Sequence, residues 1–203
     1  MIDLIKKRTL THLVILVVAG LVTTLLPQIA VAKDLLIWDK LQGTNPTGYV
    51  LLMRHALAPG IGDPENFRLG DCSTQRNLSD EGRLDAKDIG QWLERRDVKL
   101  KRVESSRWCR ARETAELLNI GPVKLNKNLD SLFSKSNLES NKQTIEIKKR
   151  IVSHRNKSGL LVFVGHQVNI SAITGIPLES GEGVLVRADR KGEIKVVGYS
   201  PVP

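Results

Sequence analysis

Two histidines of the sequence stand just beyond strand-like apolar runs. His55 follows residues 49–53 and His166 follows residues 160–164, with one residue between run and histidine in each case. The unbroken hydrophobicity of both runs predicts strands that are covered on both faces, as in a parallel sheet. Because ligands bind beyond the carboxyl ends of such strands, both imidazoles are expected at one edge of the sheet. A lone histidine after a strand is usually structural, but this matched pair predicts an active site.

Two arginines accompany the histidines and indicate which chemistry they could do. Arg54 precedes the first histidine, and Arg110 stands at the start of a predicted helix. The planar guanidinium fork matches the oxygens of a phosphate group. The combination of imidazole and guanidinium groups therefore points to phosphate chemistry. A two-histidine metal site is a competing interpretation, but the sequence lacks further ligands at the spacing of zinc sites, so no metal or other cofactor is expected.

The elements that must position these residues alternate between strand and helix. Besides the two apolar runs, a weak strand is predicted over 98–104 and an edge hairpin over 183–199. Helical stripes of apolar residues follow Ser79, cover 111–118 and recur around 141–155. This alternation predicts an α/β fold, a three-layer sandwich with a mostly parallel central sheet flanked by helices.

Residues 56–78 are rich in Gly, Pro, Asp and Asn and predict a long loop with a functional role, whose stretch at 60–64 is expected to cover the pocket. The stretch Gly-Ile-Gly-Asp-Pro at 60–64 is not a dinucleotide fingerprint, because no helix follows at the required spacing. The polar groups of residues 71–78 could bind substrate or could satisfy the turn backbone. Arg76 is the best candidate in this loop for a contact with an anionic substrate.

The charge balance of the chain indicates an anionic partner. The 203 residues include 31 Lys and Arg against 22 Asp and Glu, a net charge of +9, which attracts anions. Aromatic residues make up only 4% of the chain, too few for a base-stacking platform, and no nucleic-acid-binding motif is present. A small anionic substrate is therefore expected as the partner, and nucleic acid is not.

The first 32 residues have the features of a secretory signal peptide. A positive segment at 6–8 precedes an apolar run at 13–26 and an Ala-Val-Ala site at 30–32. Cleavage after this site would leave a single domain at 33–203 with a charge of +7, periplasmic or secreted and without stable membrane association. A retained signal anchor or a buried helix is the alternative.

Export would place the only two cysteines, Cys72 and Cys109, in an oxidising compartment. There they could form a disulfide or remain unpaired, and the sequence permits both. Neither is followed by arginine at the Cys-x5-Arg spacing of thiol-based phosphatases. Nucleophilic chemistry by cysteine is thus disfavoured.

Three blocks of the sequence resemble motifs of the histidine phosphatase superfamily, the phosphoglycerate mutase-like family. Arg54-His55-Ala56 is similar to the family's Arg-His-Gly signature, with alanine in place of glycine. The block Ser-Ser-x-x-x-Arg-Ala-x-Glu-Thr-Ala at 105–115 resembles the second-arginine motif. The block Val-Gly-His-Gln at 164–167 resembles the second-histidine motif, and the order of the blocks is that of the family.

The resemblance implies the family's fold and the activity of a histidine acid-type phosphatase on phosphomonoesters. His55 would attack phosphorus to form a phosphohistidine that water then hydrolyses. Arg54, Arg110 and His166 would bind the phosphoryl oxygens. Gln167, beside the second histidine, would contact the substrate. A non-catalytic phosphate-binding module on the same fold is the alternative function.

The resemblance does not fix the proton donor to the leaving oxygen. Many members place a glutamate between the second arginine and the second histidine, and this sequence has no clear equivalent. Asp130 lies nearest the expected place, and Glu139 and Glu182 are the other candidates. Small exported members of the family include a lipopolysaccharide-core heptose phosphate phosphatase, so envelope sugar phosphates are one implied substrate class.

Overall fold

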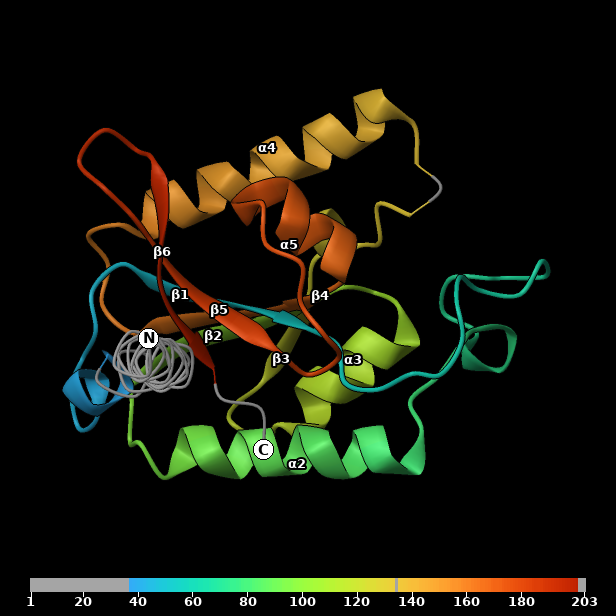
Figure 1. Ribbon diagram of the computed structural model, residues 1–203, viewed down its shortest axis with the longest axis horizontal. Helices are drawn as coiled ribbons and strands as arrows, with labels where there is room; N and C mark the ends of the chain where they lie inside the picture. The colour runs from blue at the N-terminus through green and yellow to red at the C-terminus, as the bar shows by residue number, and fades with distance from the viewer. Residues whose placement is uncertain (1–36, 134, 201–203) are drawn as a thin grey trace, which may run out of the picture. The chain divides into compact units, whose positions relative to one another are not determined.

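The computed structural model describes residues 37–133 and 135–200 (Figure 1). The predicted signal peptide, residues 1–32, lies outside the described residues. The strands are β1 (Tyr49–Arg54), β2 (Leu100–Ser105), β3 (Val123–Leu125), β4 (Leu160–Gly165), β5 (Gly183–Ala188) and β6 (Ile194–Ser200). The helices are α2 (Asp80–Glu94), α3 (Cys109–Leu117), α4 (Asn137–His154) and α5 (Gln167–Thr174), with short 3-10 turns η1 (Cys72–Thr74) and η2 (Lys127–Leu129). Within the described ranges, no helix is long and apolar enough to cross a membrane.

The strands form one six-stranded sheet in the order β3-β2-β4-β1-β5-β6. The first four strands in this order are parallel, and the predicted hairpin, β5 and β6, joins them as an antiparallel edge. Arg54 of β1 pairs with Gly165 of β4, and Ser105 of β2 pairs with Val164. The residues that follow these strands therefore start from the same edge of the sheet.

Helices cover both faces of the sheet, which confirms the predicted three-layer sandwich (Figure 1). α2 and α3 lie against one face and α4 and α5 against the other. A hydrophobic core lies on each face of the sheet, and successive side chains of β1 point to opposite faces. Leu51 and Met53 pack in the core with α2 and α3, whereas Val50 and Leu52 pack in the core with α4 and α5. Burial on both faces accounts for the unbroken apolar runs of β1 and β4.

Helix α2 fixes the backbone that follows the first histidine. It begins where predicted, with the Ser79 hydroxyl accepting a hydrogen bond from the Gly82 amide at 3.0 Å. A side chain at Gly82 would place its Cβ 2.2 Å from the carbonyl oxygen of Leu57. Only glycine permits this contact, so α2 packs directly against the chain two residues beyond His55.

Two short elements, β3 and α5, are absent from the sequence-based prediction. β3 has three residues, and α5 has eight residues ended by Gly175 in the left-handed conformation. Segments this short give little periodicity to recognise. The third predicted helix exists but begins earlier, at Asn137, because the Ser136 side chain caps it.

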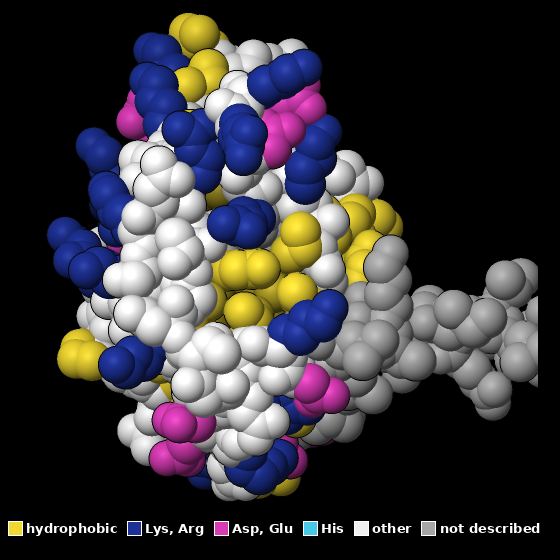
Figure 2. All heavy atoms as spheres, turned by 90° about the vertical axis from the view of Figure 1, so that its left-hand side faces the viewer, with side chains coloured by type: hydrophobic (Ala, Val, Ile, Leu, Met, Phe, Trp, Pro, Cys, Tyr) yellow, Lys and Arg dark blue, Asp and Glu magenta, His cyan; other side chains and the backbone are white. Residues whose placement is uncertain are grey.

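Positive charge is spread over one face of the molecule. Figure 2 shows a face on which Lys and Arg side chains outnumber Asp and Glu and surround a hydrophobic patch. The surplus of basic residues is therefore not confined to one site, and the position of a site must be argued from the geometry of its side chains.

Candidate active site

A cavity of about 580 Å³ lies at the carboxyl edge of the parallel strands. All six residues predicted to bind substrate or to catalyse, apart from the proton donor, line it: Arg54, His55, Arg76, Arg110, His166 and Gln167. The described part of the wall carries three arginines and Lys135 against a single carboxylate, that of Asp63. This excess of cations suits a phosphate dianion. Among the residues that the structure describes, no cluster of three His, Cys, Asp or Glu side chains could hold a metal ion.

His55 is held in the tautomer that a nucleophile needs. Its Nδ1 lies 2.8 Å from the carbonyl oxygen of Ala56, which can only accept, so Nδ1 carries the proton and donates. The lone pair of Nε2 is then available, and Arg110 Nε donates toward it at 3.3 Å. Burial lowers the pKa of His55 from 6.5 to about 3, with the positive charges of Arg110 and Arg54 acting in the same direction. The imidazole is therefore neutral at physiological pH.

His166 faces His55 across the base of the cavity. The two ring centroids are 5.4 Å apart and the ring planes are inclined by 70°. His166 Nε2 lies 3.0 Å from the Ser106 hydroxyl, which follows β2 at the same sheet edge. Burial holds the pKa of His166 well below its usual range, and the neighbouring positive groups lower it further.

The Arg110 guanidinium connects His55 to the loop at 56–78, called the covering loop below. Arg110 is only 3% exposed, and its Nη1 and Nη2 donate to the two carboxylate oxygens of Asp63 at 2.7 and 3.2 Å. Asp63 also accepts from Trp108 Nε1 and from the Arg76 amide, each at 3.1 Å. Burial raises the pKa of Asp63, but the hydrogen bonds and charge of Arg110 outweigh it and leave the pKa below its ordinary value. Asp63 is thus ionised in the free protein.

Sequence reasoning missed Asp63 as a site residue. The sequence predicts only that the stretch at 60–64 covers the pocket, and 47 positions separate Asp63 from Arg110. No spacing rule distinguishes this carboxylate from the others in the loop. A signal could have come only from its position in the loop that directly follows the first histidine.

The other two arginines are anchored to backbone carbonyls. Arg54 Nη1 donates to the Leu178 carbonyl oxygen at 2.8 Å. Arg76 donates through Nε to the Gly62 carbonyl oxygen at 2.9 Å and through Nη1 to that of Ala58. Arg76 therefore folds the covering loop onto itself while its side chain lines the cavity.

None of the three carboxylates predicted as proton donors lines the cavity within the described ranges. Asp130 is 2% exposed and accepts from the Arg107 amide at 2.9 Å and from Arg107 Nε at 2.8 Å. Both carboxylate oxygens of Asp130 are thus engaged by Arg107, and neither lies in the cavity wall. Its geometry does not support the expected role, because Asp130 instead fixes the start of the segment that leads to α3.

The other two predicted donors are also engaged elsewhere. Glu139 lies in the first turn of α4, where its carboxylate accepts from the Ser136 hydroxyl at 3.1 Å. Glu182 accepts from the Glu179 amide at 2.7 Å. Both acids were further candidates for the proton donor, but their side chains complete local turns and do not line the cavity.

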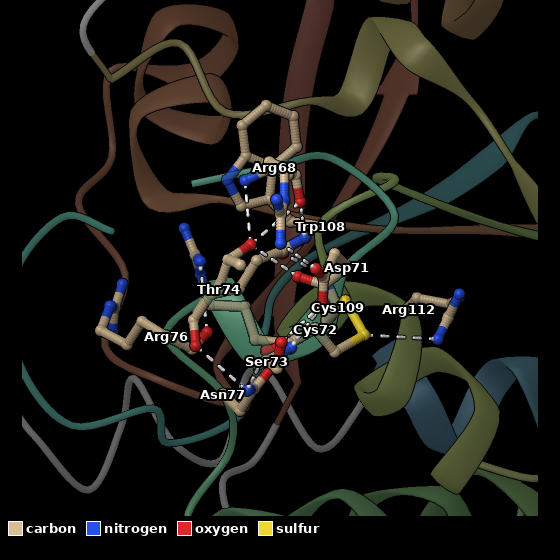
Figure 3. The surroundings of a disulfide bond; sticks show 12 residues. Arg68, Asp71, Cys72, Ser73, Thr74, Arg76, Asn77, Trp108, Cys109 and Arg112 are labelled. Carbon is tan, nitrogen blue, oxygen red and sulfur yellow. Dashed lines mark hydrogen bonds and ion pairs between the residues drawn. A yellow bond between two sulfur atoms is a disulfide. The ribbon is translucent and has the colours of Figure 1, made fainter. Parts of the chain in front are cut away.

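A disulfide joins the covering loop to the site. Cys72 in η1 and Cys109, the first residue of α3, are bonded at an S–S distance of 2.05 Å. Gln75 reinforces the junction, because its Oε1 accepts from the Cys109 amide at 2.9 Å. Figure 3 shows the segment from Asp71 to Asn77 lying against the start of α3. The bridge therefore holds the loop next to Arg110, the second residue of that helix.

Acidification is expected to destabilise the protein progressively as the pH falls from about 6.5 toward 3. An unfolded histidine binds a proton near pH 6.5, whereas folded His55 binds one only near pH 3, and the pKa of His166 is also depressed. The unfolded state then holds more protons, so the free energy of unfolding falls by about 1.4 kcal/mol per pH unit for each histidine. Thermal unfolding midpoints measured across this range should decrease steadily, and less steeply in a His55→Gln variant. A midpoint that stays constant would contradict the buried neutral imidazoles.

Known structures share this fold, whereas no family model and no curated protein matches the sequence. The protein histidine phosphatase SixA, complexed with tungstate, matches with a TM-score of 0.56 at 14% identity, over 75% of this chain and 96% of that chain. A mutant phosphoserine phosphatase from Entamoeba histolytica, complexed with phosphoserine, matches with 0.58 at 13%, over 76% and 97%. YhfR from Bacillus stearothermophilus matches with 0.52 at 19%, over 73% and 94%. The chain therefore shares the fold of these solved structures, which is the fold that the three sequence motifs led us to expect.

Proposed function

We propose that this protein is a histidine phosphatase, an acid-type phosphomonoesterase that forms a phosphohistidine on His55. The observation that carries the proposal is the hydrogen bond from His55 Nδ1 to the Ala56 carbonyl oxygen. It leaves the Nε2 lone pair inside a cavity lined by cations, where a phosphoryl group would bind. The phosphatase structures that share the fold add support.

The proposed reaction proceeds in two displacements on phosphorus. His55 Nε2 attacks phosphorus in line with the leaving oxygen, and the bond to that oxygen breaks. Water then attacks the phosphohistidine from the side on which the leaving group departed. Arg54 and Arg110 would bind the equatorial oxygens, whose charge is spread in the transition state. His166 would contribute a further hydrogen bond to these oxygens, and Gln167 and Arg76 would contact the substrate at the cavity wall.

Turnover distinguishes this function from a non-catalytic phosphate-binding module. Protein comprising residues 33–203 is given p-nitrophenyl phosphate, and the release of nitrophenol is followed. Alkaline quenching during turnover preserves an acid-labile phosphoryl group, which peptide mapping should place on His55. Binding of inorganic phosphate without any release of nitrophenol would refute the enzyme and favour the binding module.

Export is part of the proposal. Residues 1–32 would be a cleaved signal peptide and 33–203 the mature domain, in the periplasm or outside the cell. The disulfide between Cys72 and Cys109 supports an oxidising compartment. Amino-terminal sequencing of protein recovered from the periplasm or the medium tests the cleavage site after Ala32.

Envelope sugar phosphates are the proposed substrate class. Phe67 stacks on Trp108 with ring centroids 5.0 Å apart and planes inclined by 24°, and both rings line the cavity. Aromatic faces of this kind pack against the C–H faces of sugars as well as against planar groups. We expect Phe67→Ala to raise KM about tenfold for a hexose or heptose phosphate. This factor corresponds to a loss of about 1.4 kcal/mol of stacking free energy. Inorganic phosphate has no sugar ring, so its inhibition constant should change little in this variant. An equal change in the inhibition constant of phosphate and in KM for the sugar phosphate would contradict the sugar subsite.

A further inference from the structure

Asp63 is the one carboxylate among the described residues that line the cavity. It reaches the site from the covering loop, whereas His55 and His166 reach it from strand ends. The carboxylates suggested by sequence order are all bound to other groups. If the reaction needs a proton donor at the leaving oxygen, this side chain alone among those described lies within the cavity to supply it.

The Asp63 carboxylate binds the Arg110 guanidinium beside His55. Both of its oxygens accept from the guanidinium fork, and the Nε of that same guanidinium lies 3.3 Å from His55 Nε2. A phosphoryl group attacked by His55 must use these same N–H donors. Substrate binding therefore has to displace the carboxylate from Arg110.

Two further donors would keep Asp63 beside the displaced position. Trp108 Nε1 donates to Oδ2 and the Arg76 amide donates to Oδ1, and neither contact depends on Arg110. Trp108 is itself fixed by stacking on Phe67. The carboxylate can thus leave the guanidinium and remain at the cavity wall, adjacent to the bound phosphoryl group.

We propose that the Asp63 carboxylate leaves Arg110 when the substrate's phosphoryl group binds there, and that Asp63 then protonates the leaving oxygen. This proposal rests on the proposed function. A phosphomonoester monoanion carries one proton on its phosphoryl group. Because the carboxylate loses its guanidinium and faces new negative charge, it takes up this proton when the ester binds.

The atoms and charges of the step balance. The His55 Nε2 lone pair forms the P–N bond, the P–O bond of the ester breaks, and its electron pair stays on the leaving oxygen. That oxygen takes the proton from Asp63 and departs as a neutral alcohol. In the second displacement the Asp63 carboxylate accepts a proton from the attacking water. This proton passes to the product, which leaves as the phosphate monoanion, and the ionised carboxylate returns to Arg110.

Leaving-group dependence tests this role with two isosteric variants. Asp63→Asn removes the acid, and Glu65→Gln removes one negative charge from an exposed residue of the same loop that does not line the cavity. For phenyl phosphate, whose leaving oxygen needs a proton, Asp63→Asn should lower kcat/KM by about 10²-fold or more. For p-nitrophenyl phosphate, whose leaving group departs as a stable anion, the loss should stay below about threefold. Glu65→Gln should match the wild type on both esters.

Anion affinity gives a second, independent readout. The Asp63→Asn variant has no negative charge at this position to compete for Arg110, so inorganic phosphate and vanadate should inhibit it about tenfold more strongly than the wild type. A carboxylate that merely supported the loop would give equal losses on both esters and weaker inhibition, and either result would overturn the proposal. A wild-type protein without turnover would instead refute the phosphatase function itself, so the two failures are distinguishable.

Discussion

Replacement of His55 by alanine is expected to lower kcat/KM for any phosphomonoester by a factor on the order of 10⁴ or more. Nε2 of His55 has its lone pair in the cavity and lies 3.3 Å from Arg110 Nε, where a bound phosphoryl group would be within reach. Without it, water would have to displace the leaving group directly, and the division of the reaction into two displacements is lost. The phosphohistidine signal after alkaline quenching should vanish together with turnover.

The binding half of the site serves as the control for this variant. Arg54 and Arg110 remain in the His55→Ala protein, so it should still bind tungstate, as measured by calorimetry. Thermal unfolding establishes that the variant is folded before rates are compared. Residual turnover above about one hundredth of the wild-type value, with a phosphoryl group still trapped on the chain, would show that a different residue is the nucleophile.

The second large effect is expected from loss of the disulfide. Cys72 and Cys109 enclose a loop with a sequence separation of 37. Chain-entropy reasoning gives about 4 kcal/mol of stabilisation for a loop of this length, through restriction of the unfolded chain. The double variant Cys72→Ser and Cys109→Ser should lose free energy of unfolding of this order, measured by urea denaturation.

The same double variant should also lose activity. The bridge ties η1 to the first residue of α3, and thereby sets the distance between the loop that carries Asp63 and the helix that carries Arg110. Reductant should lower both stability and kcat/KM of the wild type and should leave the serine variant unchanged. A wild type that keeps its stability in reductant, while the sulfurs are shown to be free thiols, would contradict this account.

The part of the site carried by strand ends could be predicted from the sequence. Unbroken apolar runs identify strands buried on both faces, and parallel pairing forces His55 and His166 to the same edge. Arg54 follows with them because it is covalently next to the first histidine. These conclusions need only the sheet, whose register is set by hydrophobic burial.

The part carried by the loop could not be predicted in this way. Asp63 reaches Arg110 because Arg76 folds the loop through two backbone carbonyls and a disulfide anchors its end. Such contacts have no period and leave no spacing in the sequence. Asp130 illustrates the opposite case. Its order along the chain suggested a proton donor, but its buried carboxylate binds Arg107 and does not line the cavity.

The pairing of β1 has a consequence for how the molecule is synthesised. Its neighbours in the sheet are β4 and β5, so the strand that presents His55 finds both partners in the last quarter of the chain. A nascent or truncated polypeptide that ends before residue 160 would leave Val50, Leu51 and Leu52 exposed to water. The central part of the sheet can therefore form only when nearly the whole polypeptide is present. Contacts between segments so distant in sequence form slowly.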